Sequence, residues 1–274
     1  MIERVTIIGA GRVGNALAAR LPACGVRVAQ VYSRTPERAR WVAGRVGAEA
    51  IPDLAALASG SDLYLLAVPD DAIAEVATTL MKYLPEGTLL AHTSGATPVA
   101  ALPAHFRRGS FYPLQSFAPG RSVDWTTLPL CVHAFDAPTT TALQTLAQRL
   151  ATHVYRIDDA QRAALHVAAV FVNNFTHHLY HIGQQLAEQQ QVPFGLLLPL
   201  IREGVDRLGS APLGQLQTGP AVREDTQTLQ RHLALLAPHP NWQQLYRQLT
   251  ASIQRTIHQP PQPPTPDPER VEPQ

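Results

Sequence analysis

Short apolar runs and stretches of helical periodicity alternate along the first 157 residues of the chain. The runs are rich in Val, Ile and Leu, which is typical of buried strands. Eight strands are predicted, near Val5–Ile8, Val26–Tyr32, Ala50–Ile51, Leu63–Val68, Thr88–Ala91, Ser110–Leu114, Leu130–Phe135 and Val154–Ile157. The alternation predicts an α/β fold with a doubly wound, mostly parallel sheet over residues 1–157.

The pattern changes near Asp158. Helix-forming sequence runs from Asp159 to Gln190, interrupted only by Gly183, and we expect one long helix that is mostly apolar in its first half. Further helices are predicted over Phe194–Leu208, Glu224–Leu236 and Trp242–Ile257. The sequence therefore predicts an all-helical second domain over residues 158–258. Residues 259–274 hold seven prolines in sixteen positions, and we expect a disordered tail there.

The first predicted strand runs directly into three closely spaced glycines, and a helix with an apolar face follows them. A strand, a glycine turn and a helix in this order are typical of a dinucleotide-binding Rossmann domain. Gly9 permits the sharp turn, Gly11 lets the backbone approach a pyrophosphate, and Gly14 lets the helix pack on the strand. We predict a cofactor site formed by Gly9, Gly11, Arg12, Val13 and Gly14, and bordered at a strand end by Ala67, Val68 and Pro69.

The residue after the second predicted strand indicates which dinucleotide is bound. Arg34 lies about 20 residues after the last glycine, where a site for NAD carries Asp or Glu. Arginine binds phosphate with two parallel hydrogen bonds, and hydroxyls of Ser33 and Thr35 flank it. We therefore predict NADP(H). The alternative is a solvated arginine, with Glu37 reaching the ribose.

Composition and charge narrow the class of protein. The net charge of +1 argues against nucleic acid or an anionic membrane as the main partner. Cys24 and Cys131 are the two cysteines, so no disulfide framework is expected. No apolar run is long enough to span a bilayer, and the chain starts in a predicted strand without a signal-peptide pattern. We expect a cytoplasmic protein.

Several motifs follow the fingerprint in a characteristic order. They are Ala67-Val68-Pro69-Asp70, His92-Thr93-Ser94-Gly95, Pro113-Leu114-Gln115-Ser116-Phe117, then His166 with Ala168, Ala169, Asn173 and Asn174, and finally Thr218-Gly219-Pro220 with Arg223, Asp225, His232 and Leu233. Together they resemble the family of Rossmann-like NADP oxidoreductases with a helical C-terminal domain of unknown function (DUF2520 type). That family is similar to pyrroline-5-carboxylate reductase, 3-hydroxyisobutyrate dehydrogenase and the deazaflavin-dependent NADP reductases.

The chain also departs from these relatives. Tyr112 and Glu224 stand where the family often has His and Gly. Hydroxyacid dehydrogenases carry a catalytic lysine one turn before an asparagine of the long helix, and here that residue is Val170. No lysine follows Lys82, so the resemblance does not extend to a lysine mechanism.

Candidate catalytic groups gather on the predicted long helix. At 3.6 residues per turn, one arc of about 100° holds His166, Val170, Asn173, Asn174, His177 and His181. His166 is the candidate general acid, Asn174 binds a carbonyl or hydroxyl, and Ser94 lies at a strand end beside the expected nicotinamide. Candidate substrate-binding residues are Gln115, Asn173 and Arg223, the last for a carboxylate.

Plainer interpretations stay open for each of these residues. His166 also suits a packed core position, and Arg223 suits an ion pair with Asp225. Tyr112 is an alternative proton donor, although a phenol with a pKa near 10 is a weaker acid. His177 and His181 have a spacing that zinc uses, but no third ligand is evident, so we expect no metal site.

These features predict an NADP(H)-dependent oxidoreductase that transfers hydride to a small keto or imino acid. The missing lysine leaves open a non-catalytic NADP(H)-binding regulatory or scaffold protein. Reduction of a deazaflavin is a third interpretation. The long apolar helix predicts a homodimer formed through the helical domain.

Overall fold

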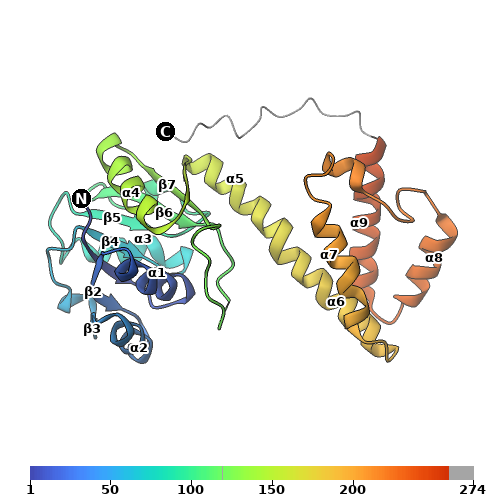
Figure 1. Ribbon diagram of the computed structural model, residues 1–274, viewed down its shortest axis with the longest axis horizontal. Helices are drawn as coiled ribbons and strands as arrows, with labels where there is room; N and C mark the ends of the chain where they lie inside the picture. The colour runs from blue at the N-terminus through green and yellow to red at the C-terminus, as the bar shows by residue number, and fades with distance from the viewer. Residues whose placement is uncertain (119, 259–274) are drawn as a thin grey trace. The chain divides into compact units, whose positions relative to one another are not determined.

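The computed structural model describes residues 1–118 and 120–258 (Figure 1). The predicted tail over 259–274 lies outside the described residues. The chain divides into two compact units, Met1–Asn174 and a second that begins at Phe175. The domain boundaries expected from the sequence stay predictions.

The first unit is built on one eight-stranded sheet with the order β3-β2-β1-β4-β5-β6-β7-β8. Neighbouring strands are parallel except for β6 and β7, which pair antiparallel. The strands are β1 Arg4–Ile8, β2 Arg27–Tyr32, β3 Glu49–Ile51, β4 Leu63–Leu66, β5 Leu89–His92, β6 Arg107–Pro113, β7 Pro129–Ala134 and β8 His153–Arg156. The predicted doubly wound, mostly parallel sheet is confirmed, with each strand where the apolar runs indicated.

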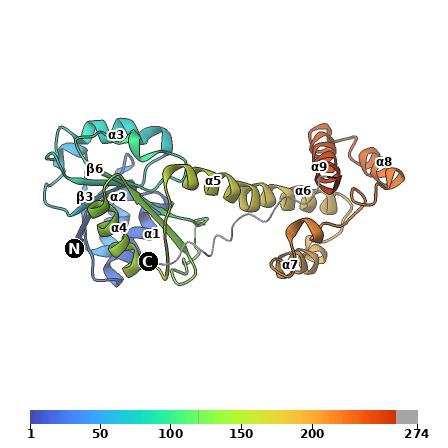
Figure 2. The ribbon, with the colours of Figure 1, turned by 90° about the horizontal axis from the view of Figure 1, so that it is seen from above.

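Helices cover both faces of this sheet (Figure 2). Helices α1 (Arg12–Ala23), α2 (Pro36–Val46) and α4 (Ala137–Leu150) pack on one face, and α3 (Ile73–Leu80) packs on the other. Side chains alternate between the two cores because successive residues of a strand point to opposite faces. In β4, Leu65 joins the core under α1, and Leu66 joins the core under α3. Both strand faces are therefore buried, as the continuous apolar runs predicted.

The second unit is helical over its described residues, as expected. It contains α6 (Thr176–Gln189), α7 (Leu198–Asp206), α8 (Thr226–Leu235) and α9 (Pro240–His258). Asp225 caps α8 by accepting a hydrogen bond from the amide of Thr228 at 3.0 Å. Helices α8 and α9 are joined by a hydrogen bond of 2.8 Å between His232 Nδ1 and Tyr246 Oη.

Helical structure runs without a break from Asp159 to Gln189, as the long helix predicted from the sequence requires, but it is not regular throughout. Helix α5 (Asp159–Ala169) ends in a π-helical segment, Val170–Phe175, and α6 follows it. A π segment has i→i+5 hydrogen bonds and a wider turn, so the angular step per residue changes there. The polar stripe calculated at 3.6 residues per turn therefore does not hold beyond Val170.

Two further findings concern the start of α3 and the length and apolar character of the helices. Asp70 and Asp71 lie in a 3₁₀ turn, Asp70–Ala72, just before α3, and neither supplies a side-chain cap to that helix. Within residues 1–118 and 120–258, no helix combines the length and apolar character that crossing a membrane requires.

Candidate functional site

The glycine turn between β1 and α1 is packed too tightly for any other residue at two positions. Gly9 has φ +116°, and a methyl group placed on it would lie 2.2 Å from the Ala67 carbonyl oxygen at the end of β4. A methyl group on Gly14 would lie 1.9 Å from the carbonyl oxygen of Gly9. These contacts hold α1 directly against the ends of β1 and β4.

Gly11 has a different environment. A methyl group there would meet only the Ala67 carbonyl oxygen, at 4.0 Å, so the space beside it is open. Gly11 is also the residue that begins α1, which has no side-chain cap and no acidic residue in its first turn. The first amides of a helix need partners, and an anion such as a pyrophosphate satisfies them. The residues present therefore fit a dinucleotide.

The residues after β2 form an exposed polar turn. Arg34 is exposed, Ser33 Oγ accepts a hydrogen bond from the Thr35 amide at 3.2 Å, and Thr35 begins α2. Glu37, the alternative ribose ligand, forms an ion pair with Arg40 at 2.8 Å. The guanidinium of Arg34 is therefore accessible at the place where a 2′-phosphate would be recognised.

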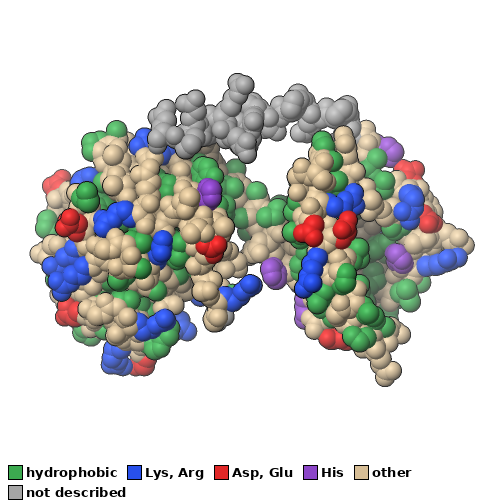
Figure 3. All heavy atoms as spheres, viewed as in Figure 1, with side chains coloured by type: hydrophobic (Ala, Val, Ile, Leu, Met, Phe, Trp, Pro, Cys, Tyr) green, Lys and Arg blue, Asp and Glu red, His purple; other side chains and the backbone are tan. Residues whose placement is uncertain are grey.

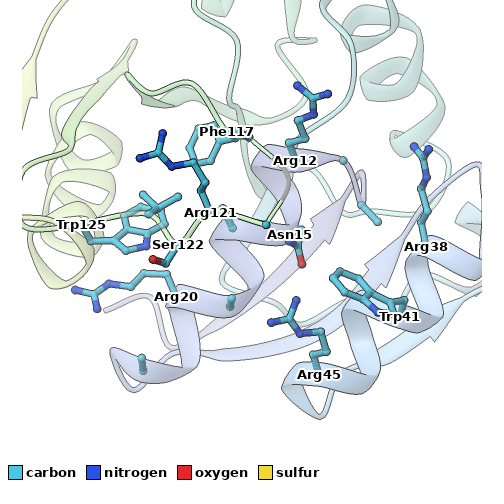
Figure 4. A pocket seen from close by; sticks show the side chains of 18 of the residues that line it. Arg12, Asn15, Arg20, Arg38, Trp41, Arg45, Phe117, Arg121, Ser122 and Trp125 are labelled. Carbon is cyan, nitrogen blue, oxygen red and sulfur yellow. The ribbon is translucent and has the colours of Figure 1, made fainter. Parts of the chain in front are cut away.

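A cavity of about 1240 Å³ begins at the glycine turn and follows α1, α2 and the segment after β6 (Figure 4). Among the described residues, its lining includes Arg12, Arg20, Arg38, Arg45 and Arg121, and the one acidic member is Glu37. Within the described part of the chain, no carboxylate lies within 4.0 Å of Arg12, Arg38 or Arg121. Figure 3 shows basic side chains on the face of the first unit that carries α1 and α2. This region suits an anionic ligand.

The cavity and the predicted cofactor residues overlap only in part. They share Gly11 and Arg12, whereas Arg34 and the end of β4 lie outside the cavity lining. The cavity thus extends from the phosphate-binding turn along the helices rather than across the strand ends.

A second group of candidate residues meets where α5 passes β6 and the segment after β5. Tyr112 Oη lies 3.2 Å from His166 Nδ1, within hydrogen-bond distance. Gly95 packs closely against both side chains. A methyl group placed on Gly95 would lie 2.5 Å from His166 Nδ1 and 2.8 Å from Tyr112 Cζ. Three elements that are far apart in the sequence therefore bring a phenol and an imidazole together.

Burial changes the acidity of several groups around this pair. It is the main cause that raises the pKa of Tyr112 to about 12, with smaller contributions from Cys131 and Asp70. Burial also lowers the pKa of His92 to about 4, and the positive charge of Arg162 acts in the same direction. Tyr112 therefore keeps its proton at neutral pH, while His92 stays uncharged.

Ser94, the third predicted catalytic residue, forms a tight turn. Its hydroxyl oxygen accepts hydrogen bonds from the amides of Ala96 at 3.1 Å and Thr97 at 2.9 Å, and lies 3.0 Å from Thr97 Oγ1. These contacts shape the segment that carries Gly95, and a catalytic role of Ser94 stays a prediction.

The remaining predicted residues lie on other segments of the chain. Asn173 and Asn174 lie in the π segment, with Asn173 Nδ2 donating to Asn174 Oδ1 at 3.3 Å. Gln115 is exposed, and its side-chain oxygen accepts from the Ser116 amide at 2.8 Å. Arg223 is an exposed residue of the second unit. Their roles stay predictions.

Sequence reasoning missed Arg162, which is 1% exposed and lies one helical turn before His166. The available indication was a charged residue on the apolar half of a predicted buried helix, three positions after Asp159. Charged side chains are almost never fully buried unless they are paired.

Comparisons with known proteins agree with this architecture. Residues 2–115 match the model of a Rossmann-like domain, and residues 128–253 match the domain of unknown function DUF2520. The structure of a Bacteroides fragilis protein, provisionally assigned as an NADP oxidoreductase, has a TM-score of 0.86 and 37% identity. That match covers 93% of this chain and 100% of the other. The chain belongs to the family of Rossmann-like NADP oxidoreductases with a C-terminal DUF2520 domain, as the motifs predicted.

More distant relatives share the fold. A reductive aminase from Aspergillus terreus, solved with NADPH and ethyl-5-oxohexanoate, has a TM-score of 0.69 at 17% identity, with 94% of each chain covered. A glycerol-3-phosphate dehydrogenase [NAD(P)+] from Moorella thermoacetica is 35% identical over 107 residues. This match spans 32% of the length of that enzyme, so the chain covers about a third of it.

Proposed function

We propose that this protein is an NADP(H)-dependent reductase of a small carbonyl or imine compound, in keeping with the keto or imino acid expected from the sequence. The observation that carries the proposal is that one unit holds both an uncapped glycine turn that fits a dinucleotide and a partly buried phenol–imidazole pair. NADPH, when bound, supplies the hydride. The chain supplies binding, orientation and a proton.

Binding rests on the turn and on the positive charge beside it. The amides that begin α1, with Gly11 at its start, hold the pyrophosphate. Arg34, with Ser33 and Thr35, selects the 2′-phosphate. We expect Arg34→Ala to weaken NADPH binding about 10- to 100-fold while NADH binding changes less than threefold, because an arginine–phosphate contact contributes about 1.5–3 kcal/mol.

Proton delivery is assigned to Tyr112 and His166. Tyr112 is protonated at neutral pH and donates from Oη to the oxygen or nitrogen of the substrate as that atom gains negative charge. His166 Nδ1, 3.2 Å away, then returns a proton to the phenolate oxygen, while Nε2 of the same ring takes up a proton from solvent. This pair takes the part that lysine has in the related hydroxyacid dehydrogenases.

Substrate orientation is assigned to the polar residues predicted from the sequence. Asn174 and Asn173 are candidates for hydrogen bonds to the substrate, Gln115 for a further polar contact, and Arg223 for a carboxylate. Variants of these four residues should raise KM more than they lower kcat, because they contact the bound substrate in the ground state.

The deciding experiment follows the hydride itself. Purified protein is incubated with NADPH deuterated at the transferable position and with a panel of small keto and imino acids, and products are examined by mass spectrometry. Deuterium in a product supports the reductase. NADPH binding with all deuterium retained on the cofactor refutes it and supports the regulatory or scaffold alternative; the same assay with a deazaflavin tests that acceptor.

A homodimer is the second part of the proposal. In the single chain, Val167, Phe171 and Val172 on α5 and the π segment are 56%, 62% and 74% exposed. Apolar surface of this kind is usually covered by a partner. Light scattering at micromolar concentration should give twice the chain mass, and a monomer would contradict this. The cytoplasmic location also stays a proposal.

A further inference from the structure

Arg162 is the largest fully buried side chain of the first unit. Its Nη1 donates to Ser110 Oγ at 2.9 Å, and its Nη2 donates to the carbonyl oxygen of Thr97. Asp159 Oδ1 lies 2.8 Å from Nη2 in an ion pair whose geometry does not make a hydrogen bond. The guanidinium thus connects α5 to β6 and to the segment after β5.

Stability alone does not explain this arrangement. Burying a guanidinium costs several kcal/mol of hydration, and an ion pair repays it only with complete hydrogen bonding. Here Arg162 Nε has no hydrogen-bond partner among the described residues, and neither does the buried Nε2 of His92. A well-packed apolar side chain would cost less, so the charge is better explained by the geometry that it imposes.

The contacts of Arg162 lie beside the phenol–imidazole pair on all three elements. Ser110 is two residues before Tyr112, so both side chains project from the same face of β6. Thr97 is two residues after Gly95, which touches both rings. Arg162 is four residues before His166, and positions i and i+4 share one face of a helix.

Asp159 strengthens the same connection. Its Oδ2 accepts a hydrogen bond from the Val99 amide at 2.9 Å, which ties the first turn of α5 to the segment after β5 a second time. The start of α5 is therefore fixed one to two turns before His166, ahead of the π segment.

We propose that Arg162 is a positioning residue that holds α5, β6 and the segment after β5 together, so that His166 Nδ1 and Tyr112 Oη stay in hydrogen-bond contact for proton transfer. The proposal rests on the proposed function of the pair. It has two separable parts: a geometric part, which needs no substrate, and a catalytic part.

The geometric part is tested by nitrogen NMR of protein labelled with ¹⁵N-histidine, with the His166 ring assigned from the spectrum of His166→Gln. Tyr112→Phe defines the spectrum of His166 without its partner. We expect Arg162→Met to give the same shifted Nδ1 resonance as Tyr112→Phe. Arg162→Lys should give an intermediate position, because a single ammonium does not reach Ser110 and Thr97 in the fork geometry of a guanidinium.

A second arginine provides the matched control. Arg149 donates to the carbonyl oxygens of Ile2 at 3.0 Å and Cys24 at 2.8 Å, so it also joins distant segments, but it has no contact with the pair. Arg149→Met should lower the melting temperature and leave the His166 resonances unchanged. An Arg162→Met spectrum that equals the wild type overturns the proposal, whatever the activity.

The catalytic part uses the best substrate found in the deuterium assay. Arg162→Met should lower kcat about 10- to 100-fold, as expected for misplacement by about 1 Å, with the NADPH dissociation constant changed less than twofold. An equal loss of kcat in Arg149→Met would make the effect structural and refute the positioning role. If Arg162→Met does not fold, Ser110→Ala removes one contact and must shift the His166 resonance in the same direction, or the proposal fails. If the wild-type protein transfers no deuterium, the proposed reductase function is refuted, but the geometric role of Arg162 is not.

Discussion

Gly11→Ala separates the binding function of the glycine turn from its structural function. Unlike Gly9 and Gly14, Gly11 has an ordinary negative φ of −74° and open space on its Cβ side. Alanine is therefore accommodated in the free protein. The cost to folding is limited to replacing a glycine with alanine at the start of a helix, which is about 1 kcal/mol or less.

The cost to cofactor binding is larger, because the new methyl group occupies the space beside the first amides of α1. A pyrophosphate held there must retreat by about 1 Å, and charge-assisted hydrogen bonds are lost. One such bond contributes about 1.5–3 kcal/mol, which corresponds to an increase in the NADPH dissociation constant of about 10- to 150-fold. We therefore expect a large loss of affinity with a small loss of stability.

Isothermal titration with NADPH measures the affinity, and urea unfolding measures the stability. Gly44→Ala is the matched control, since Gly44 lies inside α2 with nothing within 4 Å of an added methyl group. It should bind NADPH normally and gain about 0.5–1 kcal/mol of helix stability. A Gly11→Ala protein that binds NADPH within threefold of the wild type would show that no phosphate lies against this turn.

Three further predictions follow from the same geometry. Gly9→Ala should lower the free energy of unfolding by about 2 kcal/mol or more, since it combines a positive φ with a 2.2 Å contact to backbone; an unchanged urea midpoint would contradict this. Tyr112→Phe and His166→Gln should each lower kcat about 10²-fold or more without changing NADPH affinity, and activity of either variant near wild type would remove the pair from the mechanism. The pKa of His92 is lowered to about 4 in the folded protein and is near 6.5 when unfolded, so the unfolded state takes up the proton first as pH falls. The free energy of unfolding should therefore fall by up to about 3 kcal/mol between pH 6.5 and pH 4, and His92→Gln should flatten this slope; a slope equal to that of the wild type would exclude His92 as its cause.

The sheet could be predicted from the sequence because both of its faces are buried. Residues such as Leu63 to Leu66 must then be apolar at every position, and that signal is local. The π segment was not predictable in this way. It contains Val170 and Phe171, which also suit an α-helix, and the choice between i→i+4 and i→i+5 hydrogen bonds depends on packing that is not local.

The proposed cofactor residues and the proposed catalytic pair differ in how far apart their members lie in the sequence. Gly9, Gly11 and Gly14 are contiguous, and each has a reason that can be stated from backbone geometry alone. The contact of Tyr112 with His166 joins positions 54 apart, and its support through Arg162 spans up to 65. The sequence indicated Tyr112 and His166 as separate candidates. It gave no means of placing the buried guanidinium of Arg162, which joins the elements that carry them.

The position of the proposed proton donor follows from where α5 is held. Val170, where the resemblance to hydroxyacid dehydrogenases would lead one to expect a lysine, is the first residue of the π segment. His166 lies one turn earlier, on the regular part of α5 that Arg162 and Asp159 fasten to β6 and to the segment after β5. An acid is useful only where its distance to the substrate is fixed, and this part of the helix has such an anchor. Burial raises the pKa of Tyr112 to about 12, so the phenol at this anchored position keeps its proton at neutral pH.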